Sequence, residues 1–190
     1  MHKVKSYLTS FFYSYAWLAI LLLIIDQLTK LWVMKAAFNV TLIPNFLHLT
    51  YVRNTGAAWS MFDGNMVLLS IISFVVGSAI IVLRIKYRRK LDTFKKILFA
   101  VVLAGTWGNF IDRAFSKLLT GEEGVIDFIH FQFGNYHFPV FNVADICITL
   151  GILSYVVLLL IEEFKLKKEV KTTEAGNKED VQTKEDDDGH

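Results

Sequence analysis

The most conspicuous feature of the sequence is a set of long apolar runs without a charged side chain. A helix that crosses a bilayer needs about 20 predominantly apolar residues, within a range of about 17–25. The runs have 18, 19, 15 and 16 residues and are Leu8–Ile25, Asn65–Leu83, Ile97–Ile111 and Ile146–Ile161. The first two are long enough alone, and the last two only if Asp112 and Asp145 lie within the membrane or at its edge. The pattern predicts four transmembrane helices, at about residues 8–31, 65–83, 97–113 and 143–161.

Lysine and arginine are distributed unevenly among the segments that join these spans. Of the 20 in the chain, 15 lie near the N-terminus, in the segment Arg84–Lys96 or in the last 26 residues. The other five are Lys30, Lys35, Arg53, Arg113 and Lys117. Because cytoplasmic connections carry an excess of these residues, we predict that both termini and the segment Arg84–Lys96 are cytoplasmic. The longer connections, roughly residues 35–64 and 114–141, then lie outside.

Both outer connections have sequences typical of β-strands. Val40–Phe62 is rich in β-branched and aromatic residues, with turn residues at Pro44-Asn45 and at Asn54-Thr55-Gly56. The segment Phe131–Phe138 has the pattern of a hairpin around Gly134-Asn135. Since lipid does not tolerate unpaired backbone, we predict a small sheet at the outer membrane surface.

The composition places the chain among membrane proteins. Apolar residues make up 54% of the 190 residues and charged residues 20%, which excludes a disordered body and argues against a soluble single-core domain. The apolar excess lies in residues 1–164, predicted to form one integral membrane domain, whereas residues 165–190 are predicted to be a charged, disordered cytoplasmic tail. The net charge of +2 does not suggest nucleic-acid binding. The single cysteine, Cys147, excludes an internal disulfide or a cysteine-rich metal site.

Four aspartates lie in apolar surroundings, where a charged carboxylate is costly. An aspartate at the centre of a membrane helix costs about 2.5–3.5 kcal/mol on insertion scales. A chain seldom carries four such residues without a functional or a pairing reason, and all four fall towards the outer ends of their segments. One site could therefore gather them: Asp26, Asp112, Asp127 and Asp145.

The neighbours of two of these acids indicate ion pairing. Asp26 and Lys30 are four residues apart on one helix face, which fits an anchoring ion pair and a functional pair equally well. Asn109, Asp112 and Arg113 share a helix face at spacings of three and four. Because a neighbouring cation favours a plain carboxylate, we predict that Asp112 and Arg113 form a structural or substrate-positioning pair.

The other two acids have contrasting surroundings. Asn142 stands where the N-cap of a helix is expected, three residues before Asp145, so Asp145 lies in the first turn, where the helix dipole favours its charge. Asp127 has apolar neighbours and no adjacent cation, and desolvation should raise its pKa. Two carboxyl groups in opposed environments are what a division between acid and base requires.

Other catalytic chemistries find less support. His48, His130 and His137 lie in the outer connections without metal-ligand spacing, and we predict them to be surface or interfacial residues. Ser60 has no base close to it in the sequence, which disfavours a serine nucleophile. From composition alone a peptidase, a proton-coupled carrier and a structural protein remain open, because intramembrane acids also mark ion pathways.

Five short motifs separate these alternatives. They occur in order between residues 26 and 145 and are Asp26-Gln27-Leu28-Thr29-Lys30, Arg53-Asn54-Thr55-Gly56-Ala57-Ala58-Trp59, Gly105-Thr106-Trp107-Gly108-Asn109-Phe110-Ile111-Asp112-Arg113, Val125-Ile126-Asp127-Phe128-Ile129 and Phe138-Pro139-Val140-Phe141-Asn142-Val143-Ala144-Asp145. With these motifs the chain resembles bacterial lipoprotein signal peptidase, also called signal peptidase II, of peptidase family A8. Each motif alone is weak, but all five in this order are very specific.

The resemblance implies an all-α membrane protein with four transmembrane helices and a small extracytoplasmic β-rich cradle. It implies an aspartic endopeptidase that removes the signal peptide from diacylglyceryl-modified prolipoproteins, cutting before the lipidated cysteine. The expected location is the bacterial cytoplasmic membrane, with the active site near the outer face. The implied partners are the prolipoprotein substrate and membrane lipid. A metal, another cofactor, nucleic acid or an oligomer is not implied.

The motifs also assign residues. The family's catalytic pair maps onto Asp127 and Asp145, and the alternative pairs Asp112 with Asp145. We favour Asp127, because Arg113 beside Asp112 gives that carboxylate another role. The positions implied for substrate binding are Asn54, Gly56, Asn109, Arg113 and Asn142. The supporting positions are Asp26, Lys30 and Asp112.

Two features depart from the family pattern. The third motif begins Ala104-Gly105, where the family more often has two glycines, and Trp107 is bulky for its position. Gly105 and Gly108 still permit close helix packing, but the packing around Trp107 is expected to differ. The connection Ala114–Gly124 looks longer than usual, so its path is not predicted.

Overall fold

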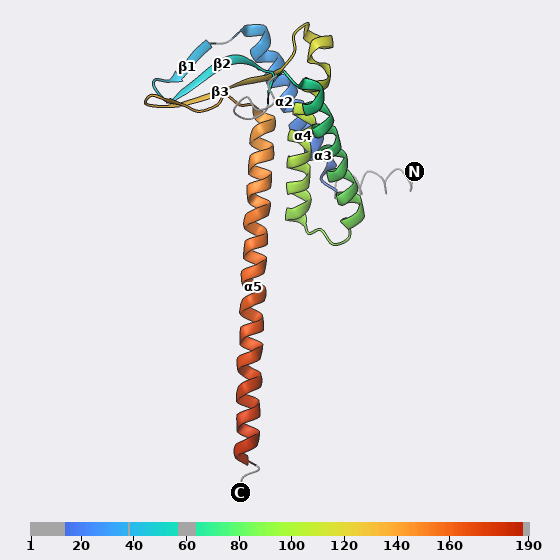
Figure 1. Cartoon of the computed structure of the whole chain (residues 1–190), viewed down its shortest axis with the longest axis vertical. Coiled ribbons are helices and arrows are strands. Elements are labelled where there is room, and N and C mark those ends of the chain that lie inside the picture. Colours follow the sequence, from blue (N-terminus) through green and yellow to red (C-terminus); the bar gives the residue numbers. More distant parts are fainter. Residues whose placement is uncertain (1–13, 38, 57–63, 188–190) are drawn as a thin grey trace. The chain divides into compact units, whose positions relative to one another are not determined.

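The computed structural model describes residues 14–37, 39–56 and 64–187 (Figure 1). In these residues the helices are α2 (Ala16–Ala36), α3 (Met66–Tyr87), α4 (Thr93–Thr120) and α5 (Val143–Asp187). The strands are β1 (Asn39–Ile43), β2 (Leu47–Asn54), β3 (Val125–Phe133) and β4 (Tyr136–His137). All four helices are long and apolar enough to cross a membrane. The predicted fold class, four spanning helices with a small sheet, is confirmed.

Helix α4 extends beyond its predicted span at both ends, from residues 97–113 to Thr93–Thr120. Asp92 caps its start, where the side chain accepts a hydrogen bond from the Lys95 N–H at 2.8 Å. Gly121 ends the helix in the left-handed conformation, with φ at 79°. Helix formation continues past the apolar run because caps, not hydropathy, end a helix. Most of the connection whose path was not predicted is therefore helical.

The structure describes the first predicted span and the predicted tail only in part. Residues 8–13 of the first predicted span lie outside the described residues. Contacts divide the chain into residues 1–152 and 153–190, and the described part of the second unit continues α5. The sequence predicts a disordered tail from residue 165 onwards, but residues 165–187 belong to this helix. Lysine and glutamate are frequent in this segment, and both are good helix formers. The division into a membrane domain, 1–164, and a cytoplasmic tail stays a prediction.

The strands form one antiparallel sheet in the order β1-β2-β3-β4, with β2 between β1 and β3 (Figure 1). The turn between β1 and β2 contains Asn45, whose φ is 57°. The turn between β3 and β4 contains Gly134, whose φ is 62°. These are the turns that the sequence predicts. Residues 57–62 of the predicted β-rich stretch lie outside the described residues.

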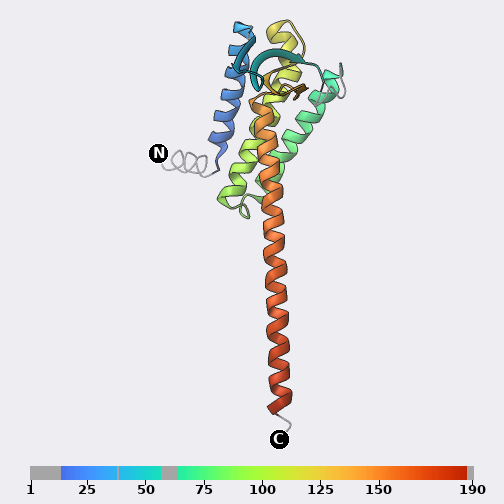
Figure 2. The same ribbon diagram turned by 90° about the vertical axis from the view of Figure 1, so that its left-hand side faces the viewer.

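Two glycines allow α4 to approach its neighbours closely. A Cβ on Gly105 would collide with the carbonyl oxygen of Ala144 in the first turn of α5. A Cβ on Gly108 would lie 2.6 Å from the Asp26 Oδ2 on α2. Helix α4 also packs along α3 (Figure 2). The predicted close packing is confirmed, and it brings the polar residues of α2, α4 and the start of α5 together.

Trp107, the bulky residue of the third motif, packs against α3. A Cβ on Gly77 would lie 2.9 Å from the Trp107 Nε1, so the indole occupies the space that this glycine leaves. Phe74 and Phe110 meet the indole edge-on, with ring centroids at 6.0 and 5.1 Å. Gly77 thus accommodates the tryptophan, a compensation between two helices that the sequence alone does not reveal.

Candidate active site

A buried ion-pair cluster lies between α2 and α4. Lys30 Nζ lies 2.8 Å from the Asp26 Oδ2 and 2.7 Å from the Asp112 Oδ2. Asp26 and Lys30 are each 1% exposed, and Asp112 is 8% exposed. Gln27 Nε2 donates hydrogen bonds to both carboxylates, at 3.1 and 3.2 Å. Buried charges require such partners, and the predicted pairing of Asp26 with Lys30 is confirmed.

Asp112 pairs with Lys30 and not with Arg113, which corrects the predicted partner. Successive residues on a helix point about 100° apart, so Asp112 meets α2 while Arg113 meets α3. There Arg113 Nη1 donates a hydrogen bond to Ser73 Oγ at 2.9 Å. The guanidinium charge also interacts with the carboxyl groups of Asp145, Asp127 and Asp112, most strongly with that of Asp145. Arg113 is therefore a positive charge shared among three acids, while the close ion pair of Asp112 is with Lys30.

Asn142 caps α5 in the way the sequence predicts. Its Oδ1 accepts the Asp145 N–H at 3.0 Å, and the Asp145 Oδ2 accepts the Asn142 N–H at 3.1 Å. This reciprocal arrangement is a capping box with an aspartate in its third helical position. From α2, the Asp26 Oδ1 accepts the Ala144 N–H at 2.8 Å. The first turn of α5, which carries Asp145, is thus held both by its own side chains and by α2.

Asp127 lies on β3 and is 2% exposed. Its Oδ1 accepts a hydrogen bond from Asn142 Nδ2 at 2.6 Å, and its Oδ2 accepts one from Asn54 Nδ2 at 2.8 Å. Burial, and then the negative charge of Asp145, raise the pKa of Asp127 from 3.8 to about 7. The direction is the one predicted from its apolar neighbours.

Asn109 on α4 joins Asp145 to the ion-pair cluster. Its Nδ2 donates to the Asp145 Oδ1 at 2.7 Å, and its Oδ1 lies 3.2 Å from both Lys30 Nζ and Asn142 Nδ2. All four aspartates therefore belong to one hydrogen-bonded network. Two of them hold Lys30, and the other two share Asn142.

A cavity of about 790 Å³ opens beside the second pair of acids. Charged and amide side chains gather in its lining from β2, α4, β3 and α5, namely Arg53, Asn54, Asn109, Arg113, Asp127 and Asp145, and Thr55 and Thr149 add hydroxyl groups. The remaining lining is mostly apolar and includes Phe138, Phe141, Ile146 and Leu150. A largely apolar pocket with a few convergent polar groups is typical of a ligand site.

Two of the residues predicted to bind substrate do not line this cavity. Asn142 is fully buried behind Asp127 and Asp145. Gly56 donates its N–H to the Asn54 Oδ1 at 3.0 Å and so fixes the orientation of that amide. Both residues hold others in place. Residues 57–63, which follow Gly56, lie outside the described residues.

Arg53 has a role that the sequence reasoning missed. Its Nη2 donates to Thr120 Oγ1 at 2.8 Å, and its Nη1 donates to the Gly124 carbonyl oxygen at 3.1 Å. Its Nε lies 3.5 Å from the Glu122 Oε2. One guanidinium thus ties β2 to the turn between α4 and β3, which leads to Asp127. Its only signal in the sequence is its place at the start of the second motif.

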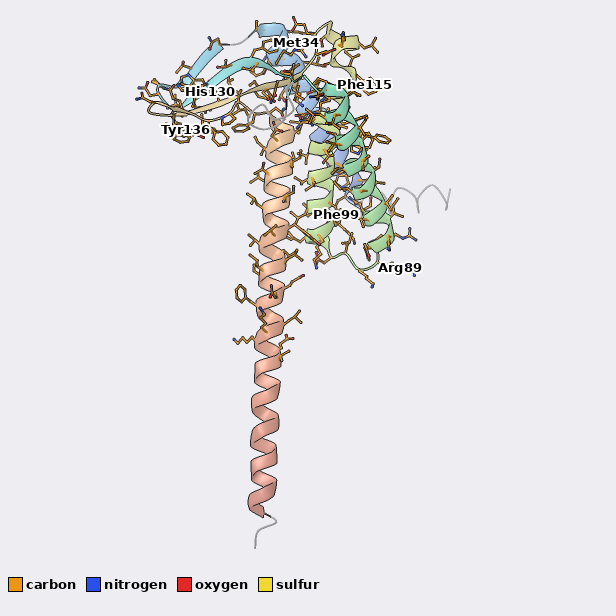
Figure 3. The ribbon with its side chains drawn as sticks, in the orientation of Figure 1. Met34, Arg89, Phe99, Phe115, His130 and Tyr136 are labelled. Atoms are coloured by element: carbon orange, nitrogen blue, oxygen red, sulfur yellow. The ribbon has the colours of Figure 1, made fainter. Side chains whose placement is uncertain are left out.

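The three histidines lie apart from this cavity, on the sheet. His48 pairs with His130 across β2 and β3, and His130 Nε2 lies 3.2 Å from His137 Nδ1. Figure 3 shows His130 and Tyr136 on the sheet. Burial and the neighbouring histidines lower the pKa of His130. Among the described residues, no group of three or more histidine, cysteine, aspartate or glutamate side chains is arranged to hold a metal ion.

Comparison with known proteins agrees with this architecture. The family described as signal peptidase (SPase) II matches residues 18–161. A lipoprotein signal peptidase of Clostridium acetobutylicum is 38% identical over 147 residues, which are 75% of this chain and 91% of the relative. One of Bacillus pumilus is 35% identical over 154 residues, 80% of this chain and 95% of the relative.

Solved structures support the same relationship. A bacterial membrane enzyme determined by the in meso method at 2.3 Å superposes with a TM-score of 0.64 at 35% identity, over 76% of this chain and 85% of that one. A second, at 1.9 Å, has a TM-score of 0.61 at 34% identity and covers 75% of this chain and 89% of that one. Four apolar helices, a small antiparallel sheet and relatives along most of the length place this chain in the signal peptidase II family, peptidase family A8.

Proposed function

We propose that this protein removes the signal peptide from diacylglyceryl-modified prolipoproteins, cutting before the lipidated cysteine, with Asp127 and Asp145 as its catalytic pair. Membership of the signal peptidase II family makes the protein a membrane-bound aspartic endopeptidase. One observation carries the choice of residues: both carboxyl groups line the same cavity, and Asn142 donates its side-chain N–H to the carboxyl of Asp127 and its backbone N–H to that of Asp145. The alternative, Asp112 with Asp145, loses support because the Asp112 carboxylate is occupied by Lys30.

The two acids begin the reaction in different protonation states. Asp127 holds a proton, because burial and the charge of Asp145 raise its pKa to about 7. The role of base falls to Asp145, whose two oxygens accept hydrogen bonds from a backbone N–H and from the Asn109 amide. Near neutral pH the pair therefore shares one proton, as two adjacent carboxyl groups do when they cannot both ionise easily.

The reaction then needs only this pair and water. Asp145 takes a proton from a water molecule while the water oxygen attacks the scissile carbonyl carbon, and Asp127 donates its proton to the carbonyl oxygen. In the tetrahedral intermediate that results, the C–N bond breaks, the leaving amine takes the proton held by Asp145, and one hydroxyl returns its proton to Asp127. The products are a carboxylic acid and an amine, and the pair regains its starting state.

The other polar residues of the site position substrate and acids. Asn54, Asn109 and Asn142 orient the two carboxyl groups through their amides. Arg113 lines the cavity with its guanidinium anchored on Ser73, where it can hold the peptide by its carbonyl groups. Gly56 supports Asn54, and the cluster of Asp26, Lys30 and Asp112 supports Asn109.

The proposed setting is the bacterial cytoplasmic membrane, with both termini inside and the active site near the outer face. The excess of lysine and arginine in the termini and in the segment Arg84–Lys96 supports this orientation. Apolar residues of α5 that line the cavity, Ile146 and Leu150, leave the lipidated end of the substrate beside the acyl chains of the bilayer. Residues 165–190 then form a cytoplasmic tail.

The test is cleavage of a diacylglyceryl-modified precursor by the purified protein in detergent, with the new N-terminus identified by mass spectrometry. We expect the parent to cut before the lipidated cysteine and Asp127→Asn and Asp145→Asn to be inactive but folded. Asp92→Asn is the matched control, because this carboxylate caps the far end of α4. An inactive parent would overturn the proposed function, and a fully active Asp127→Asn would overturn the choice of this residue.

A further inference from the structure

Threonines inside the apolar helices usually donate their hydroxyl groups to the helix itself. Three of them donate to the carbonyl oxygen four residues earlier, at 2.8 or 2.9 Å, and these are Thr29, Thr106 and Thr120. Such a bond satisfies a hydroxyl where water is scarce. Thr149 on α5 differs, because its hydroxyl makes no hydrogen bond within the part of the chain that the structure describes.

The position of Thr149 relates this hydroxyl to the proposed catalytic pair. Thr149 is exposed and lines the same cavity as Asp127 and Asp145. It follows Asp145 by four residues on α5, so the two side chains lie on one face of the helix, about 6 Å apart along its axis. The hydroxyl therefore faces the cavity one helical turn from the acid.

The wall that α5 contributes to the cavity is otherwise apolar beyond Asp145. Among the described residues, it consists of Ile146, Ile148, Thr149 and Leu150. A peptide strand along this wall would leave most of its N–H and C=O groups without partners, which is costly away from water.

A diacylglyceryl group suits the same wall better than a peptide. Its acyl chains are apolar, and its ester carbonyls accept hydrogen bonds but need no acceptor in return. The hydroxyl of Thr149 can donate one such bond, and Ile146 and Leu150 on either side of it offer apolar contact. One donor among apolar side chains therefore matches an ester better than a peptide backbone.

We propose that Thr149 donates a hydrogen bond to an ester carbonyl of the diacylglyceryl group and so favours substrates whose lipid is ester-linked. The proposal rests on the proposed function and adds the side chain that recognises the lipid. A short glyceryl thioether separates the ester from the cysteine backbone, and it spans a distance comparable with one helical turn. With the ester at Thr149, the bond that precedes the cysteine lies at the level of Asp145.

The test compares two precursors that differ only in the linkage of the lipid. One carries the diacylglyceryl group, and the other carries a dialkylglyceryl ether of equal chain length, which lacks both carbonyls. In Thr149→Val, which keeps the shape of the side chain, we expect KM for the ester precursor to rise about 2- to 12-fold, the range for one neutral hydrogen bond. The kcat should not change, because the contact exists both before and during the reaction. KM for the ether precursor should also stay the same.

Two further variants separate the hydroxyl from other effects of the substitution. Thr149→Ser keeps the hydroxyl and should restore most of the preference for the ester. Thr93→Val is the matched control, because Thr93 is an exposed threonine at the start of α4 that does not line the cavity. It should change neither KM.

Equilibrium binding gives a second readout that does not depend on cleavage. A short peptide that begins with diacylglyceryl-cysteine should bind the parent more tightly than its ether analogue does. The ratio of the two Kd values should be about 2- to 12-fold in the parent, and the two values should become equal in Thr149→Val.

Three outcomes would overturn the proposal. One is an equal rise of KM for both precursors in Thr149→Val, which would assign the hydroxyl to the peptide or to the helix itself. Another is a parent that does not distinguish the ester from the ether. The third is the same change in Thr93→Val. If the parent cleaves neither precursor, the proposed function fails, whereas the binding comparison still decides the role of Thr149.

Discussion

Asn142 offers a test in which stability and catalysis separate. Its side chain makes three hydrogen bonds: it accepts the Asp145 N–H at 3.0 Å as a helix cap, and it donates to the Asp127 Oδ1 at 2.6 Å and to the Asn109 Oδ1 at 3.2 Å. Asn142→Ala removes all three. The lost cap costs about 1 kcal/mol of stability, and a lost hydrogen bond to the neutral carboxyl group of Asp127 costs about 0.5–1.5 kcal/mol.

Asn142→Ser divides these effects. Serine caps a helix about as well as asparagine, but its hydroxyl is too short to serve Asp127 as well. We expect Asn142→Ser to restore most of the thermal stability lost in Asn142→Ala. Its kcat should remain about 2- to 12-fold below the parent, which is the loss of about 0.5–1.5 kcal/mol expressed as a rate. The assays are thermal unfolding in detergent and steady-state cleavage of a lipidated precursor.

The reasoning would be refuted if Asn142→Ser cleaved as fast as the parent, because the Asp127 contact would then contribute nothing to catalysis. It would also be refuted if both variants lost stability equally. In that case the hydrogen bond to the Asp145 N–H would not be what holds the first turn of α5.

Three further predictions follow from other parts of the fold. The pKa of Asp127 is raised from 3.8 to about 7, so cleavage should decline above about pH 7 as the proton needed by the carbonyl oxygen is lost. Because the folded state binds this proton more tightly than the unfolded state, the free energy of unfolding should also fall as the pH rises from about 4 to 7. Its slope against pH should be shallower in Asp127→Asn, and equal slopes for parent and variant in denaturant titrations would contradict this. Gly105→Ala should destabilise the protein more than Gly77→Ala, because the added methyl group meets backbone at position 105 but the Trp107 side chain at position 77. Overpacking typically costs about 1–3 kcal/mol. Thermal unfolding of both variants measures which one loses more stability. Arg53→Lys should lower kcat several-fold, because a lysine cannot reproduce the contacts of the guanidinium with Thr120, Gly124 and Glu122 at the same time. Limited proteolysis should then cut more readily near residues 121–124, and unchanged proteolysis would contradict this role of Arg53.

Much of the framework can be predicted from local patterns in the sequence. The apolar runs locate all four helices, and Gly134-Asn135 locates a hairpin, because both depend on residues close in the chain. The cap of α5 by Asn142 is also a local feature, visible in its spacing of three from Asp145.

Partners across helices are harder to predict. Asp112 stands beside Arg113 in the sequence but pairs with Lys30, because the rotation of α4 turns the two residues towards different helices. Ser73 lies in an apolar run that gives no hint of its hydrogen bond to Arg113. Gly77 likewise gains its meaning only from Trp107, thirty positions later. Such contacts depend on the relative rotation of packed helices, which hydropathy does not encode.

The most direct test of the central claim asks whether Asp127 and Asp145 act as one unit. Single-turnover cleavage rates would be measured for Asp127→Asn, Asp145→Asn and the double variant with the same lipidated precursor. Residues that act as a unit are strongly non-additive. We predict that each single variant loses nearly all activity and that the double variant is no slower than either. Rates that fall by the product of two separate factors, or a single variant that cleaves like the parent, would contradict the account.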